Sequence, residues 1–291
     1  MKKTTILLIL VNVATAQLCA QSLDGLGRIK ESDIYYSKGF ELRAHKIESL
    51  ISNAVHFYNV QLNFRPKVTV LVLNEKDWHE HTSMPVYGMP HYNHDSTLVV
   101  AATNNPMWKA FLPDLKQLPA TLAKKVRETY TNENGELTME SFFDLLALHE
   151  LGHAYHIQKG LNVQRKWMGE LFCNIFLHTY VAERAPRLLD ALVVFPEMVV
   201  SMGGSSFRFR TLDEFETNYD LLGQNYPTNY GWYQCRFHMA AGKIYDNHGA
   251  DAIHRLWDSL HAKEPIADDA VLAEKLRKEV NPAISDFMLK W

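Results

Sequence analysis

The spacing of apolar residues separates an early part of the chain with strand patterns from a longer part with helical patterns. Residues 67–73 (KVTVLVL) and 97–101 (TLVVA) are apolar and rich in β-branched side chains, so each predicts a strand. Prolines and a glycine between positions 85 and 90 predict a loop between the two strands. Residues 40–58 carry apolar side chains at helical spacing and predict an amphipathic helix. We therefore expect a small sheet in the N-terminal part.

From about residue 138 the apolar positions follow a helical period. Thr138 can cap a helix that ends at Gly160, and a second helix is predicted from about residue 165 to Glu183, before Pro186. Residues 193–206 fit no single element, because a proline and two glycines interrupt the pattern. Further helices are predicted at residues 213–222, 231–245, 250–261 and 268–290, the last with a break at Pro282.

The first twenty residues have the pattern of a secretory signal peptide. Lys2 and Lys3 precede a short apolar stretch at residues 6–14, and small residues at 14 and 16 suit cleavage. The stretch is shorter than a membrane-spanning helix requires. We expect a signal peptide at 1–20, a secreted or periplasmic product and no membrane span after cleavage. The remainder, 21–291, is predicted to be one α+β domain: a sheet-containing part at about 30–135, then a mostly helical part at about 136–291.

Composition and charge agree with a globular domain and limit its partners. The 291 residues are 47% hydrophobic and 22% charged, with a formal net charge of -3. No stripe of Lys and Arg is dense enough to follow phosphates, so we expect no nucleic-acid partner. After cleavage only Cys173 and Cys235 remain. They could form one disulfide in an exported chain, but both lie in apolar, helix-like stretches, where two buried free thiols are an open alternative.

One motif carries specific chemistry. His149-Glu150-Leu151-Gly152-His153 is an HExxH sequence within the predicted helix that ends at Gly160. Residues i and i+4 share one face of a helix, so His149 and His153 can reach one metal ion. Neutral imidazoles suit Zn²⁺, which also needs a third protein ligand and an open position for water. Glu150 can take a proton from that water and act as the general base.

The third ligand is predicted on the next helix. Glu170 follows His153 after sixteen residues and lies near the start of that helix, so an antiparallel neighbour can bring its carboxylate to the metal. Asn174, one turn further on, could form a hydrogen bond to a ligand. Glu183 is the alternative ligand, although its place beside Arg184 also suits a solvated ion pair.

These residues resemble the gluzincins, zinc metallopeptidases with HExxH on one helix and Glu on the next. Trp167 and Glu170 resemble the W-x-x-E pattern of that family, and the likeness to thermolysin- and aminopeptidase-like catalytic domains covers roughly residues 65–260. The resemblance implies a zincin-like fold whose edge strand binds the peptide substrate. Asn174 stands where the family often has an acidic residue. The family also uses a Tyr or His to stabilise the oxyanion, for which Tyr233 and Tyr230 are the candidates.

The sequence thus predicts a secreted Zn²⁺ metallopeptidase whose substrate is a peptide or protein. Two alternatives remain: a zinc hydrolase of a non-peptide amide, and a catalytically idle zincin-like binding module. No feature specifies an oligomeric state, and Ser205 and Ser206 lack the surroundings of a catalytic serine.

Overall fold

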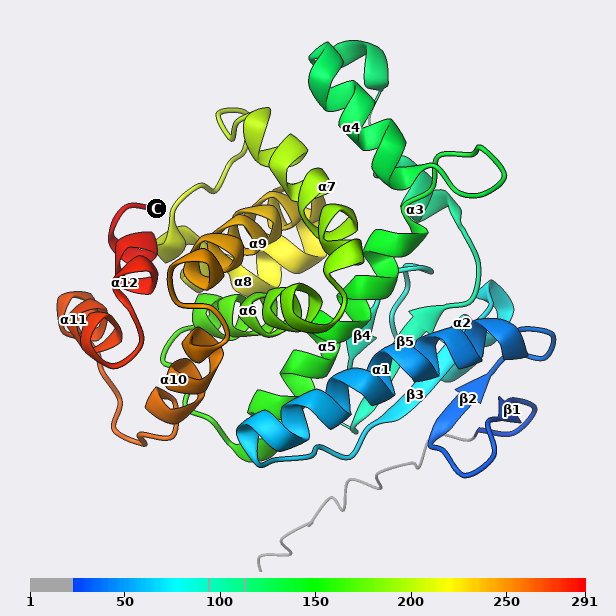
Figure 1. Cartoon of the computed structure of the whole chain (residues 1–291), viewed down its shortest axis with the longest axis horizontal. Coiled ribbons are helices and arrows are strands. Elements are labelled where there is room, and N and C mark those ends of the chain that lie inside the picture. The colour runs from blue at the N-terminus through cyan, green and yellow to red at the C-terminus, as the bar shows by residue number, and fades with distance from the viewer. Residues whose placement is uncertain (1–22, 94, 113) are drawn as a thin grey trace, which may run out of the picture.

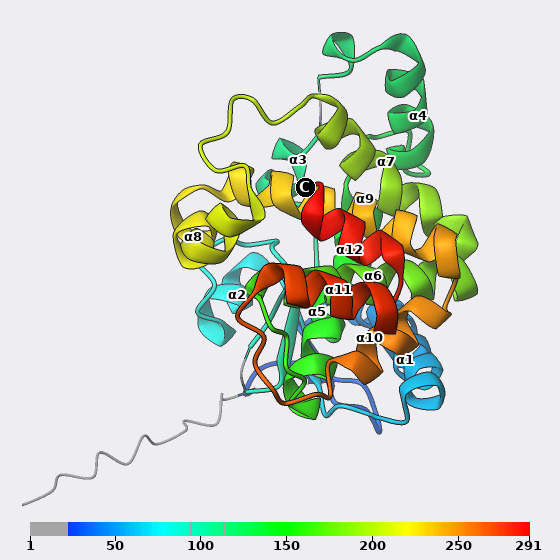
Figure 2. The same cartoon turned by 90° about the vertical axis from the view of Figure 1, so that its left-hand side faces the viewer.

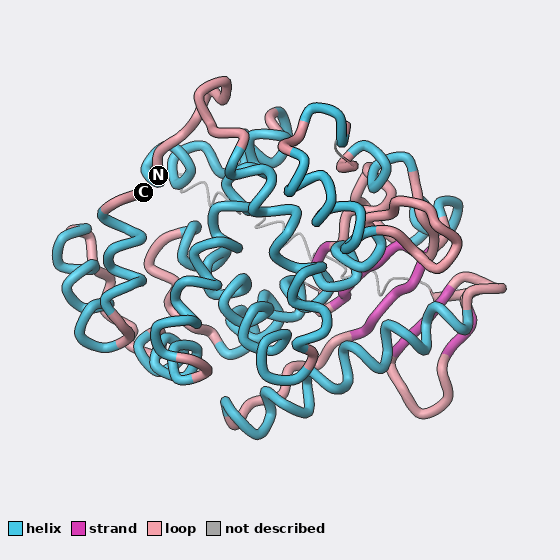
Figure 3. Tube along the Cα trace, turned by 45° about the horizontal axis from the view of Figure 1, so that its top comes forward, coloured by secondary structure: helices cyan, strands magenta, loops and turns pink. Residues whose placement is uncertain are grey.

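The computed structural model describes residues 23–93, 95–112 and 114–291. The predicted signal peptide lies outside these residues. The described part is α+β: a small mixed sheet near the N-terminus and helices over most of the remaining chain (Figure 1). Figure 3 shows that the strands gather on one side of the molecule and that helices occupy the rest. This agrees with the predicted class.

The sheet has five strands in the order β1-β2-β3-β5-β4. The strands are β1 (Gly27–Arg28), β2 (Ile34–Tyr36), β3 (Thr69–Leu73), β4 (His91–Tyr92) and β5 (Thr97–Ala101). Strands β2, β3 and β5 are parallel, and Val70 of β3 is opposite Leu98 of β5. Strand β4 is antiparallel to β5 and forms one edge of the sheet. The two predicted strands are confirmed as β3 and β5, whereas β1, β2 and β4 carry no sequence pattern.

Twelve α-helices occur in the described residues. They are α1 (Glu41–Leu62), α2 (Glu75–His81), α3 (Pro106–Ala110), α4 (Ala120–Tyr130), α5 (Glu140–Lys159), α6 (Lys166–Arg184), α7 (Leu189–Ser201), α8 (Leu212–Asn225), α9 (Pro227–His248), α10 (Asp251–Ser259), α11 (Asp269–Glu279) and α12 (Pro282–Leu289). The unassigned stretch before residue 206 begins as α7, which contains Pro196. The predicted break at Pro282 separates α11 from α12.

Helix α5 joins the sheet to the helical part. It contacts β4 and β5 on one side and α6 on the other, and α1 packs against both α5 and the sheet (Figure 1). Every residue of α6 from Trp167 to Val181 is buried, because α5, α8, α9 and α10 all pack against it. Helices α11 and α12 pair with each other and contact α10 and α9 (Figure 2). The interface of α5 and α6 therefore lies deep in the molecule.

Two further features bear on the sequence predictions. Cys173 and Cys235 are both buried and both free, so they form no disulfide. Among the described residues, no helix combines the length and apolarity that crossing a membrane requires.

Candidate metal centre

The HExxH motif lies in the middle of α5, on the side that faces α6. Apolar neighbours such as Phe143 and Leu148 bury this helix, and Gly160 ends it in a left-handed conformation. The ring centroids of His149 and His153 are 5.0 Å apart. His149 is almost fully buried, and the side chain of His153 is 18% exposed. The predicted pairing of the two imidazoles on one helical face is therefore present.

Glu170, the predicted third ligand, lies between the two imidazoles. Its Oε2 atom is 3.1 Å from Nε2 of His149 and 3.7 Å from Nε2 of His153, and the residue is 2% exposed. Nitrogen and oxygen ligands bonded to a tetrahedral zinc ion at 2.0–2.1 Å lie about 3.3 Å apart. The two distances from Glu170 Oε2 to the imidazole nitrogens are close to this value. The alternative, Glu183, accepts a hydrogen bond from the Tyr245 hydroxyl at 2.6 Å, in an exposed position near the end of α6.

Cys173 adds a sulfur that sequence analysis did not assign to the site. One ligand atom each from His149, His153 and Cys173 lies within 4.8 Å of the other two, a cluster that could hold a metal ion. The two donor sets share both imidazoles and differ in the third ligand. Glu170 Oε2 lies within 3.7 Å of Nε2 in both imidazoles, and the sulfur of Cys173 lies within 4.8 Å of a nitrogen in each. Cys173 follows Glu170 by three residues, so the two side chains are neighbours on one face of α6. This spacing is the sequence signal that could have identified the thiol as part of the site.

Helices α8 and α9 supply three hydrogen-bond donors to Glu170. The Tyr219 hydroxyl donates to Oε1 at 2.5 Å, the Tyr230 hydroxyl donates to Oε1 at 3.3 Å, and Gln234 Nε2 donates to Oε2 at 2.8 Å. Gln234 also donates to the Tyr230 hydroxyl and accepts from Asn174. These bonds fix the orientation of the carboxylate. Tyr219 and Gln234 were not predicted; only the one-turn spacing from Tyr230 to Gln234 hints at a shared face.

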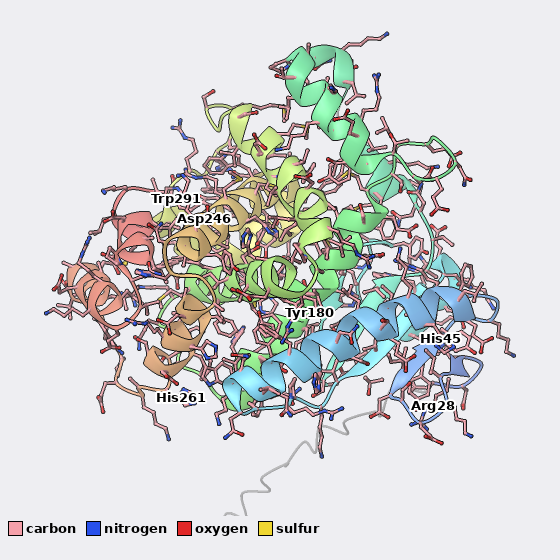
Figure 4. All side chains as sticks on the ribbon, viewed as in Figure 1. Arg28, His45, Tyr180, Asp246, His261 and Trp291 are labelled. Carbon is pink, nitrogen blue, oxygen red and sulfur yellow. The ribbon has the colours of Figure 1, made fainter. Side chains whose placement is uncertain are left out.

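Tyr233, the first candidate for the oxyanion, lies elsewhere. Its hydroxyl donates to the carbonyl oxygen of Thr211 at 2.8 Å, and its ring stacks on Trp291, which is labelled in Figure 4. Residues three apart on a helix point in directions that differ by about 60°. When Tyr230 faces Glu170, Tyr233 therefore turns toward the C-terminal residues. The prediction for Tyr233 needs this correction, while Tyr230 is beside the cluster.

Burial controls the charge of the imidazoles and carboxylates. Burial lowers the pKa of His153 to about 3, so this imidazole is neutral near pH 7. Burial also lowers the pKa of His149, but the hydrogen bond to Glu170 outweighs this effect and raises it. Burial would raise the pKa of Glu170, yet His153, His149 and Tyr219 together hold it far below its usual value. Glu170 is thus an ionised carboxylate within a buried site.

Glu150 lies at the boundary between α5 and the edge strand. Burial raises its pKa to about 7, opposed in part by His149 and by a hydrogen bond with the backbone of Tyr92 in β4. A carboxylate with a pKa near neutrality can both accept and release a proton. Within the described residues, β4 is paired only with β5. An unpaired strand edge therefore lies next to Glu150.

Two buried atoms in the cluster have no hydrogen-bond partner. They are Nδ1 of His149 and Oδ1 of Asn174. The Asn174 side chain nevertheless contributes to the raised pKa of His149, which requires that the two groups lie close together. Asn174 Nδ2 donates to the carbonyl oxygen of Glu170 at 2.9 Å, which leaves Oδ1 as the unused acceptor of this side chain. A ligand imidazole commonly donates its second N–H to such an acceptor.

Comparison with known proteins returned no match to a family model, to a curated protein or to a solved structure.

Proposed function

We propose that this chain is a zinc metallopeptidase of the gluzincin type, with His149, His153 and Glu170 as the metal ligands and Glu150 as the general base. The observation that carries the proposal is the position of Glu170 Oε2, 3.1 Å and 3.7 Å from the two Nε2 atoms. Two imidazoles and one carboxylate are the donor set of catalytic zinc sites that leave one position open.

The charge of the site favours a bound cation. The hydrogen-bond and ion-pair partners of Glu170 in the described part are histidines, tyrosines and a glutamine, without a lysine or arginine. Glu150 is a second carboxylate in the same buried region. Burying an anionic group without a counter-charge costs on the order of several kcal/mol of folding free energy. Protonation of His149, whose pKa the hydrogen bond to Glu170 raises, offsets part of this cost. A divalent cation would offset more of it.

The proposed reaction uses these residues in separate roles. When bound, zinc would polarise the scissile carbonyl and lower the pKa of water to about 7. Glu150, whose own pKa is about 7, takes a proton from the attacking water and passes it to the leaving amine nitrogen. Burial raises the pKa of the Tyr230 hydroxyl well above its usual value, so it stays protonated and can donate to the developing oxyanion.

Strand β4 would orient the substrate. An extended peptide can add to an unpaired strand edge through main-chain hydrogen bonds, and this edge lies beside Glu150. Such binding recognises backbone more than sequence, which suits a peptide or protein substrate. With the signal peptide expected at residues 1–20, the peptidase would act outside the cytoplasm.

The proposal is tested by measuring metal content and peptide hydrolysis in three variants. Glu150→Gln should retain one zinc per chain and lose activity by about 10²–10⁴-fold, since it removes the base and leaves the ligands. His149→Ala should lose the metal. Glu183→Gln, on the same helix as Glu170 but away from the cluster, is the control and should behave as wild type. A wild-type chain that contains no zinc and takes none up would refute the proposal, as would a fully active Glu150→Gln variant.

A further inference from the structure

The thiol of Cys173 is directed at the interface between α5 and α6. Cys173 follows Glu170 by three residues and is fully buried. A Cβ atom added to Gly152, which lies between the two histidines of α5, would be 3.1 Å from Cys173 Cα and 3.2 Å from its Sγ. Because Gly152 has no side chain, the sulfur of Cys173 can pack directly against the HExxH helix.

The sulfur is also near the ring nitrogens. The ligand atoms of His149, His153 and Cys173 lie within 4.8 Å of one another. For a tetrahedral ion with a nitrogen bond of about 2.1 Å and a sulfur bond of about 2.3 Å, the two ligand atoms lie about 3.6 Å apart. The largest adjustment needed to bring sulfur to the metal is thus about 1 Å, within the range of a side-chain rotation.

We propose that Cys173 is a fourth protein donor that can occupy the open position of the metal site and hold the enzyme in a latent form. This inference rests on the proposed function. In the open form His149, His153 and Glu170 hold the ion and water takes the fourth position. In the closed form a sulfur–metal bond replaces the bond to water, the thiol proton passes to solvent and the water leaves, with no change in oxidation state. Four protein ligands are typical of structural zinc sites, which do not catalyse.

The closed form makes a prediction about metal preference. Thiolate is a soft ligand, whereas carboxylate and water are hard. A site that can recruit Cys173 should therefore retain soft ions such as Cd²⁺ more strongly than a site limited to imidazole and carboxylate. Cys235 provides a matched control: it is also buried and free, but it belongs to no such cluster in the described part of the chain.

The experiment replaces the metal with Co²⁺ in the full-length protein and records absorption spectra of wild type, Cys173→Ser and Cys235→Ser. Wild type and Cys235→Ser should show a sulfur-to-cobalt charge-transfer band in the near ultraviolet, in addition to the visible bands that report cobalt binding. Cys173→Ser should keep the visible bands and lose the sulfur band. The affinity of Cys173→Ser for Cd²⁺ should be at least about tenfold lower than that of wild type, because loss of even an outer-sphere partner of a metal costs about tenfold. The zinc-loaded form of this variant should have a higher kcat than wild type.

The possible results separate the two proposals. Visible bands without a sulfur band in wild type would mean that Cys173 only packs, and would overturn the inference while leaving the metallopeptidase proposal intact. Absence of any cobalt binding would overturn both. The spectrum of wild type is decisive by itself if Cys173→Ser does not fold, and Cys173→Ala then serves as the second variant because it is smaller and lacks a buried hydroxyl.

Discussion

The two halves of α5 bury charge in different ways. In the N-terminal half, Asp144 is paired with Arg43, whose Nη1 lies 2.8 Å from Oδ2, and with Lys46 at 3.0 Å. Lys46 also contacts Glu140 at 2.9 Å. Both cations come from α1, so this cluster has two positive and two negative groups and is neutral within the protein.

Around the C-terminal half of α5, Glu150 of this helix and Glu170 of α6 face imidazoles instead of permanent cations. Burial lowers the pKa of His153 to about 3 and raises that of Glu150 to about 7. The comparison teaches how to distinguish a structural cluster from a ligand site. The first cluster is complete with protein groups alone and joins α1 to α5. The second depends on a titratable imidazole, His149, whose pKa the hydrogen bond to Glu170 raises. A divalent cation in place of that proton is what the proposed zinc site would add.

The first way to test the comparison is to break the neutral cluster. Arg43→Met removes the guanidinium that is 10% exposed and leaves Asp144 buried with only Lys46. We expect the free energy of unfolding to fall by about 3 kcal/mol, because an uncompensated buried charge remains. Urea unfolding with and without chelator should show the same loss. Lys46→Met is the control: Lys46 is 57% exposed, so the loss should stay below about 1 kcal/mol. If the loss of unfolding free energy in Arg43→Met depended on bound metal, the two clusters would be coupled and the comparison would fail.

The second test adds the missing cation. Free Zn²⁺ at about 100 times its dissociation constant should stabilise the folded chain by about 2.7 kcal/mol, because it binds the folded state alone. The shift in unfolding midpoint should disappear in His153→Ala and persist in Arg43→Met. If Zn²⁺ stabilises His153→Ala as strongly as wild type, the ion binds at some other place.

The third test changes the packing between α5 and α6 without replacing any side chain of the metal site. Gly152→Ala would place a Cβ atom 3.1 Å from Cys173 Cα, and backbone cannot move without separating the helices. Overpacking costs about 1–3 kcal/mol, and alanine returns about 1 kcal/mol of helix propensity, so we expect a net loss of about 0–2 kcal/mol and weaker zinc binding. Gly169→Ala is the matched control on α6, since its Cβ would meet its nearest neighbour, His156, at 3.8 Å. Equal stability and zinc affinity in the two variants would show that the close approach at Gly152 has no role.

The parts of the site that the sequence predicted are those held within one helix or by its nearest neighbour. The spacing of His149 and His153 follows from helical geometry alone, and Glu170 follows from the next helix packing against α5. Tyr219 was not predictable, because its approach to Glu170 depends on how α8 crosses α6. Strand β4 has only two residues, which gives no periodicity, and its pairing with β5 creates the strand.

The sequence also did not predict which face of α9 contacts the site. Trp232, Tyr233 and Phe237 line one side of the helix, and Tyr230 and Gln234 line another, so aromatic residues alone do not indicate which side faces α6. Tertiary packing decides between the two tyrosines, and a short-range pattern cannot.

The smallest expected effect concerns this division of α9. Tyr233→Phe removes one neutral hydrogen bond, to the carbonyl oxygen of Thr211 at 2.8 Å, and keeps the ring stacked on Trp291. We expect the free energy of unfolding to fall by about 1 kcal/mol, with unchanged zinc content and unchanged kcat per bound zinc. Tyr230→Phe is the comparison, since it removes a hydroxyl that bonds to Glu170 and Gln234 and should reduce kcat as well as stability. A loss of kcat in Tyr233→Phe without loss of stability would return Tyr233 to the catalytic role expected from the sequence, and the two sides of α9 would no longer differ in function.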